Sequence, residues 1–118
     1  MYDVIFFEMN NRSPAEDFLF SLDEATFSKC LKIINLLEKY GLVIGMPYVK
    51  KITSELFELR IREKVEVRFL FSFKNNRFYI LHGFKKKRAK ILTKDIIIAK
   101  NRLTLIKRIC YIRQYEKL

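Results

Sequence analysis

The sequence predicts an α+β fold, in which an antiparallel β-sheet meander packs against an N-terminal helical hairpin and a C-terminal helix follows. Residues 56–87 alternate apolar and polar side chains with a period of two, which is typical of strands. Residues 13–40 carry helix-start residues followed by apolar side chains at helical spacing. The chain has 118 residues, so we expect one domain over residues 1–118 with a core of its own.

The N-terminal segment predicts one strand and then a short helix. Residues 2–7 form an apolar run that we expect at or near an edge of the same sheet. Ser13 and Pro14 have the residue types of an N-cap and a first helical position, and Glu16 can complete a capping box. We expect this helix to end near Leu22.

A longer helix should follow between Asp23, as its N-cap, and Tyr40, with Gly41 ending it. Its expected buried face consists of Phe27, Cys30, Leu31, Ile34 and Leu37. Residues 41–54 contain two glycines and one proline, and they predict an irregular connection.

The meander is predicted from three consecutive runs, at residues 57–61, 65–73 and 77–84. Residues 62–64 connect the first two runs. Residues 74–76 predict a tight turn before the third run, because Asn tolerates the left-handed backbone that hairpin turns require. In the first two runs the apolar side chains share one face and most of the charged ones share the other. We therefore expect the helical hairpin to cover the apolar face and the arginines to point away from the core.

The last helix is predicted to begin at Thr93 and to extend to about Ile112. At about 100° per residue, its apolar side chains fall into two stripes. One stripe comprises Ile96, Ala99, Leu103, Ile106 and Cys110, and the second comprises Ile98, Leu105, Ile109 and Ile112. One stripe should pack on the sheet or the hairpin. The second is either buried in a groove or exposed as a partner-binding surface, with Ile98, Leu105 and Ile109 as its candidates.

Positive charge is concentrated in the second half of the chain. Residues 1–58 carry 6 Lys/Arg and 9 Asp/Glu side chains, whereas residues 59–118 carry 18 and 4, within a net charge of +11. Such an asymmetry favours a polyanionic or acidic partner, and nucleic acid is the first candidate. The alternative is a basic surface that serves only solubility.

Other function classes are not indicated. No apolar run approaches the roughly 20 residues of a membrane helix, and the N-terminus does not resemble a signal peptide, so we expect a cytoplasmic protein. Cys30 and Cys110 lie in apolar helical segments and are expected as buried thiols rather than a disulfide. One histidine and two scattered cysteines do not have the spacing of a metal site, so we expect no metal and no cofactor.

Arg60 and Arg68 are the first candidates for a functional site. They should share a face of neighbouring strands, where two guanidinium groups suit a phosphate. Glu58 and Glu66 lie on the same face, so cross-strand ion pairing is the alternative role. His82, the single histidine, is suited to proton transfer near neutral pH, and a structural histidine is the alternative reading.

A basic cluster follows the third strand, and Phe84 lies at its start. An aromatic ring beside lysines can stack on an unpaired base, although Phe84 can equally close the core. Lys86 and Lys87 are candidates for proton transfer or phosphate binding. The remaining candidate RNA contacts are Arg62, Lys85, Arg88, Lys90, and Lys50 and Lys51 in the 41–54 connection. The alternative for that connection is a plain loop without RNA contacts.

The order of three motifs resembles the HigB-like branch of the RelE/ParE superfamily of toxins, which belong to bacterial and phage toxin–antitoxin modules. The motifs are ELR at 58–60, VRFLF at 67–71 and LHGFKKK at 81–87. The resemblance covers roughly residues 2–108. This chain departs from it at residues 88–92, which read RAKIL where the family usually has a KT-x-KTP-like segment.

The resemblance implies a RelE-like fold and a toxin that cleaves mRNA within the translating ribosome, without a metal, by attack of the RNA 2′-hydroxyl on phosphate. Arg60 and Arg68 would stabilise the phosphate charge, and His82, Lys86 or Lys87 would act as acid or base. The implied partners are mRNA, the ribosome and a cognate antitoxin, either helix-turn-helix or acidic, and a homodimer is an alternative assembly. Two other functions stay open: a ParE-like gyrase inhibitor without catalytic residues, and a degenerate homologue that only binds nucleic acid.

Overall fold

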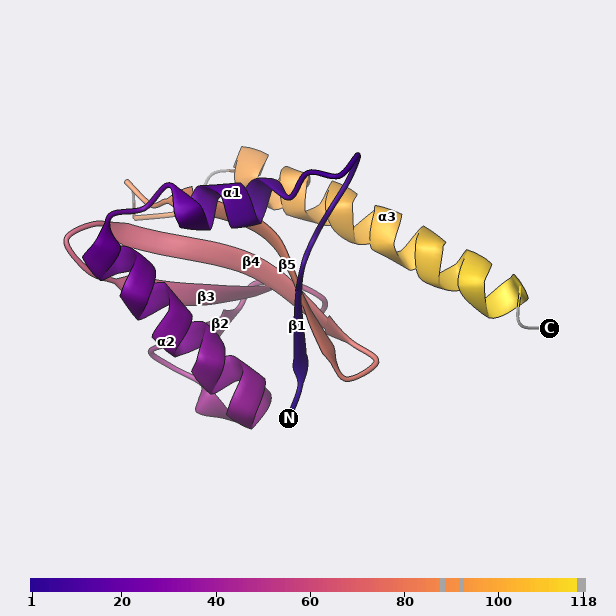
Figure 1. Ribbon diagram of the computed structural model, residues 1–118, viewed down its shortest axis with the longest axis horizontal. Helices are drawn as coiled ribbons and strands as arrows, with labels where there is room; N and C mark the ends of the chain where they lie inside the picture. Colours follow the sequence, from indigo (N-terminus) through magenta and orange to yellow (C-terminus); the bar gives the residue numbers. More distant parts are fainter. Residues whose placement is uncertain (88, 92, 117–118) are drawn as a thin grey trace.

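The computed structural model describes residues 1–87, 89–91 and 93–116, with side chains up to residue 109. It contains one five-stranded sheet in the order β1-β5-β4-β3-β2 (Figure 1). The strands are β1 (Asp3–Phe6), β2 (Val49–Lys51), β3 (Phe57–Arg62), β4 (Glu66–Lys74) and β5 (Arg77–Lys85). The helices are α1 (Pro14–Phe20), α2 (Glu24–Tyr40), the 3-10 turn η1 (Gly41–Ile44) and α3 (Thr93–Glu116).

The α+β prediction is confirmed, and β3, β4 and β5 form the expected antiparallel meander. Asn75 and Asn76 both adopt left-handed backbone, with φ of 52° and 64°, as a two-residue hairpin turn requires. The complete sheet is mixed, however, because β1 pairs in parallel with β5 at one edge. The opposite edge is β2, a strand that lies within the segment 41–54 expected to be irregular.

The helical hairpin covers one face of the sheet, as predicted. Its core contains Ala15 and Leu19 of α1, Ile33 and Leu37 of α2, and inward-facing side chains of the meander: Leu59, Ile61, Val67, Phe69, Phe71, Phe78 and Ile80. Cys30 belongs to this core as expected, and burial raises the pKa of its thiol to about 12. The side chain of Cys110 lies outside the described residues.

Three local predictions on the hairpin are corrected. The Ser13 side chain makes no capping hydrogen bond, so there is no capping box, and α1 ends at Phe20 rather than near Leu22. Leu31 is 39% exposed, and Ile33 takes its place in the core. The Asp23 cap of α2 is confirmed, because its carboxylate accepts from the backbone N–H of Thr26, and Gly41 ends the helix with φ of 71°.

The second face of the sheet is not open, which is the largest departure from the sequence prediction. Helix α3 crosses it and then projects beyond the strands (Figure 1). A second core forms there from Phe7, Leu56, Leu70, Tyr79 and Leu81 of the β-sheet side and Ala99, Leu103 and Ile106 of α3. The first predicted stripe of α3 is therefore the buried one, apart from Cys110, whose side chain is outside the described residues.

A β-bulge in β5 decides which side chains face α3. Leu70 pairs with His82, whereas the next residue, Phe71, pairs with Ile80, so β5 has one extra residue at this point. Phe78 and Ile80 face the hairpin, and uninterrupted alternation would place His82 beside them. The extra residue shifts the alternation, so His82 bonds to α3 and Gly83 faces the hairpin.

Gly83 lets α1 approach the sheet closely. A Cβ atom at this position would lie 2.6 Å from Cδ2 of Phe18 and 2.7 Å from Cε1 of Phe69. These two rings also pack edge to face, with centroids 5.8 Å apart. The glycine of the HGF motif is thus required by packing.

We predict that Gly83→Ala destabilises the fold by about 1–3 kcal/mol, because the added methyl group overpacks the contact between α1 and the sheet. Urea denaturation measures the free energy of unfolding. Phe18→Leu combined with Gly83→Ala should recover part of the loss, because it removes one of the two rings that the methyl group meets. A single variant as stable as the wild type would contradict this packing.

Candidate functional site

Arg60 and Arg68 are direct cross-strand neighbours, as the sequence predicted, and Arg68 also pairs with Phe84 of β5. The row Arg60–Arg68–Phe84 therefore crosses three strands. The arginine side chains are not open to solvent, however, because that of Arg68 is 0% exposed and that of Arg60 is 11% exposed. The expectation that Arg68 points away from the core is wrong, because its side chain is fully buried on the sheet face that carries the second core.

Glu58 lies between the two arginines and is itself buried, with a side chain 2% exposed. Its Oε1 is 3.3 Å from Nε of Arg60 and 3.6 Å from Nε of Arg68. Neither Nε–H is aligned for a hydrogen bond, so both contacts are ion pairs. Arg68 donates from Nη1 to the Val67 carbonyl at 3.0 Å and lies 3.5 Å from Glu66. The cross-strand ion pairing that the sequence left as an alternative is therefore present.

A cleft of about 300 Å³ opens at the end of β5 beside the start of α3. Its lining combines one aromatic ring, a group of amines, one aliphatic side chain and one carboxylate: Phe84, Lys85, Lys86, Lys87, Lys90, Ile91, Lys94 and Asp95. The structure thus brings together five of the sequence-predicted residues, from Phe84 to Lys87 and Lys90. Arg88 lies outside the described residues.

His82 does not line this cleft and lies behind two residues that do. Its Nε2 is 2.8 Å from Oδ1 of Asp95, and its ring stacks on Phe84 with centroids 5.4 Å apart and planes 23° apart. Because a carboxylate only accepts, the contact places the imidazole proton on Nε2. Burial lowers the pKa of His82, and the hydrogen bond and charge of Asp95 act in the opposite direction.

Asp95 was missed by the sequence reasoning. It is 7% exposed, lies in the first turn of α3 and is the carboxylate of the cleft. In the sequence, Asp95 is an acidic residue two positions after the expected helix start. Acidic residues are common there because they interact favourably with the helix dipole, so this position alone does not indicate a site. Its contact with His82 depends on the bulge in β5.

The remaining basic candidates are distributed over the sheet. Arg62 is exposed and lies near the cleft. It pairs with Glu66 across the strands, and the Glu66 carbonyl accepts from the backbone N–H of Lys86, a cleft residue, at 2.8 Å. Lys50 and Lys51 are both exposed on β2, at the far edge of the sheet from β5. Lys51 pairs with Phe57, which faces the hairpin, so it points away from the α3 side.

The second stripe of α3 is divided between the interior and the surface. Leu105 packs partly against the second core, Ile98 is half-buried, and Ile109 is 49% exposed. The side chain of Ile112 lies outside the described residues. A partner surface on this helix is therefore restricted to a narrower strip than the sequence suggested.

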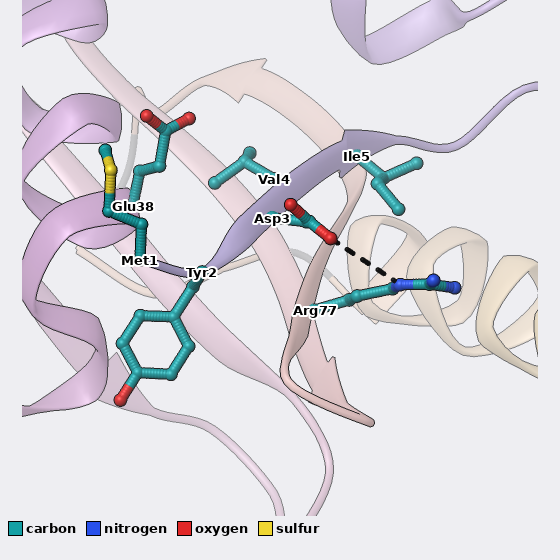
Figure 2. A pocket seen from close by; sticks show the side chains of 7 residues that line it. All are labelled: Met1, Tyr2, Asp3, Val4, Ile5, Glu38 and Arg77. Carbon is teal, nitrogen blue, oxygen red and sulfur yellow. Dashed lines mark ion pairs between the residues drawn. The ribbon is translucent and has the colours of Figure 1, made fainter.

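A second hollow of about 620 Å³ lies along β1 and the end of α2 (Figure 2). Met1, Asp3, Glu38 and Arg77 are among its lining residues, and Nε of Arg77 is 3.8 Å from the Asp3 carboxylate. Sequence-predicted site residues are not part of this lining. Within the described residues, no three His, Cys, Asp or Glu side chains form a group that could hold a metal ion.

The fold and the cleft define a basic, single-sheet α+β protein of RelE-like architecture. The chain belongs to the family of phage-derived Gp49-like proteins, because the model of that family matches residues 17–104. This is a RelE-like toxin family of toxin–antitoxin systems. A search of curated proteins finds no significant match. In the part of the chain that the structure describes, no helix has the length and apolar character to cross a lipid bilayer.

We predict that Arg68→Ala destabilises the protein by about 3–5 kcal/mol, because it removes one partner of a buried ion pair and leaves Glu58 undercompensated. Arg62→Ala is the matched control. Its side chain is 60% exposed in an ion pair with Glu66, and such surface pairs contribute at most about 1 kcal/mol. Urea denaturation measures the free energy of unfolding of both variants. An equal loss of stability in the two variants would contradict the buried ion-pair network.

The protonation of His82 should make the free energy of unfolding depend on pH. The pKa of His82 lies below its ordinary value of 6.5, so the unfolded chain binds more protons than the folded one just below that pH. The free energy of unfolding should therefore fall as pH decreases through about 6.5 and level off below the folded-state pKa.

Nuclear magnetic resonance of the single imidazole gives the folded-state pKa directly. His82→Gln should remove the stability step. A measured pKa at or above 6.5 would show that Asp95 outweighs burial.

Proposed function

We propose that this chain is the toxin of a type II toxin–antitoxin module, of the HigB-like branch, and that it cleaves mRNA on the ribosome. The observation that carries the proposal is the cleft at the end of β5. There a half-buried aromatic ring and five lysines line one cleft, within a chain of net charge +11. Stacking of an unpaired base with cation–phosphate contacts is a general mode of single-stranded RNA binding.

The proposed reaction uses the RNA as its own nucleophile. A neutral amine of Lys86 or Lys87 takes the proton of a ribose 2′-hydroxyl, and the oxygen attacks the adjacent phosphorus. The bond from phosphorus to the 5′-oxygen breaks, leaving a 2′,3′-cyclic phosphate and a 5′-oxygen that takes a proton from the ammonium group of the other lysine. Neighbouring ammonium groups stabilise the charge on phosphate, and the ribosome orients the substrate.

The arginines and His82 then have supporting roles. Arg68 is fully buried and lies next to Phe84 across the strands. Both arginines are ion-paired with glutamates, so we assign to Arg60 and Arg68 a structural role beneath the cleft rather than direct contact with phosphate. His82 stacks behind Phe84 and bonds to Asp95, so it positions both side chains.

The proposed partner is a cognate antitoxin, which the family membership suggests. An acidic segment would fit the basic cleft, because complementary charge accelerates and directs association. The exposed strip of α3 at Ile109, with Ile98 and Leu105 beside it, is the proposed apolar part of that contact. The protein would act in the cytoplasm, where its mRNA substrate is translated.

A non-catalytic toxin remains the second candidate, and two observations favour it. His82 does not line the cleft and Arg68 is fully buried, so two expected catalytic side chains do not reach a bound phosphate. A ParE-like gyrase inhibitor or a nucleic-acid binder requires neither.

We predict that Lys86→Ala combined with Lys87→Ala relieves growth inhibition upon induced expression and lowers the cleavage rate by ~10²–10³ or more. The physical reason is the loss of both the base and the acid from the phosphate site. Lys32→Ala with Lys39→Ala removes the same charge from exposed positions of α2 and should remain toxic.

Primer extension on cellular mRNA gives the deciding measurement. Codon-associated cuts by the wild type and the α2 control, and their loss in the cleft variant, support the ribonuclease. Growth inhibition with DNA-damage signalling and intact mRNA would instead indicate a gyrase inhibitor.

A further inference from the structure

Asp95 is a buried carboxylate in a cleft whose other charged groups are all cationic. A negative group in this place opposes the binding of phosphate, so RNA backbone binding alone does not account for it. Its position in the first turn of α3 suits the helix dipole, but that role is served equally by a carboxylate pointing into solvent. Asp95 lines the cleft instead.

Among the described residues, His82 is the hydrogen-bond partner of this carboxylate, and it leaves most of the carboxylate's acceptor capacity unused. An ionised carboxylate has about four lone-pair sites on two oxygens. His82 donates to Oδ1, which accounts for one of these sites, and it stacks on the ring of Phe84. The acceptor and the ring are therefore fixed relative to each other by the same imidazole.

The neighbouring residue supplies a donor. Lys94 precedes Asp95 in α3 and lines the same cleft, so the cleft offers both an ammonium donor and a carboxylate acceptor. Phe84 contributes an aromatic surface for stacking. The cleft volume of about 300 Å³ is at the lower end for small-ligand pockets, which suits one nucleotide and not a duplex.

We propose, building on the proposed RNA-binding function, that this cleft recognises one unpaired guanine. Guanine presents an acceptor, O6, followed by two adjacent donors, N1–H and N2–H, on its Watson–Crick edge. Lys94 donates to O6, and the two oxygens of Asp95 accept from N1–H and N2–H while Phe84 stacks on the base. Lys85, Lys86 and Lys87 contact the phosphates on either side.

The other bases do not match this pattern. Adenine and cytosine each place a ring-nitrogen acceptor next to a single exocyclic donor, and that acceptor would face a carboxylate oxygen. Uracil has one N–H between two carbonyl oxygens. A pair of good hydrogen bonds to a base edge gives discrimination on the order of tenfold or more.

The test is fluorescence anisotropy with short uridine-rich RNA strands that differ in one central base, with a 2′-O-methyl group at that position to block cleavage. Salt must be low and constant, because phosphate contacts depend on it. We expect the guanine strand to bind on the order of tenfold more tightly than the adenine, cytosine and uracil strands.

Asp95→Asn makes the test specific. An amide offers one acceptor and one donor, which matches adenine or cytosine, so this variant should shift its preference from guanine to those bases rather than merely bind more weakly. Asp17→Asn, the same change at an exposed position in the first turn of α1, should retain the guanine preference. Circular dichroism of both variants checks the fold.

The outcomes separate the two proposals. Equal affinity of the wild type for all the strands overturns the guanine assignment and leaves the nuclease proposal intact. Absence of binding to every strand, together with intact mRNA after induction, overturns the proposed function itself. The wild-type comparison decides the assignment even if Asp95→Asn does not fold.

Discussion

The β-bulge in β5 is the constraint on which the candidate site depends. One extra residue between the pairs Leu70–His82 and Phe71–Ile80 reverses the alternation of the strand. It turns His82 toward α3, and Gly83 toward the ring of Phe18. Without it, the imidazole would enter the hairpin core, where its polar atoms would need other partners. The contact between His82 and Asp95, which ties the start of α3 to the sheet, exists because of this irregularity.

Burial of both faces of the sheet changes the meaning of its arginines. On an open face, Arg60 and Arg68 would be ligands for a phosphate. In the folded protein they are buried and form a network with Glu58, in which the charges compensate one another and the hydrogen bonds are incompletely aligned. Such a network contributes little net stability but is costly to break. Its role in the proposed function is to support the strands beneath Phe84.

The cleft combines groups that come from two elements with different constraints. Phe84 and the first lysines continue β5, whereas Lys94 and Asp95 belong to α3. The lysines attract any polyanion, and this attraction carries no base information. Asp95 weakens that attraction locally and, in the proposed assignment, supplies the selectivity that the lysines lack.

The sequence by itself determined the α+β class, the meander, the Asn75-Asn76 turn, the caps of α2 and the basic cluster, because each depends on local periodicity, turn chemistry or composition. It did not reveal β2, the parallel pairing of β1 or the role of Asp95. Those features depend on contacts between segments distant in the chain. Only the tertiary structure decided that Arg68 is interior and that Asp95, not His82, lines the cleft. The reason is that α3 covers a face whose polar residues look solvent-exposed when only the strand's own alternation is considered.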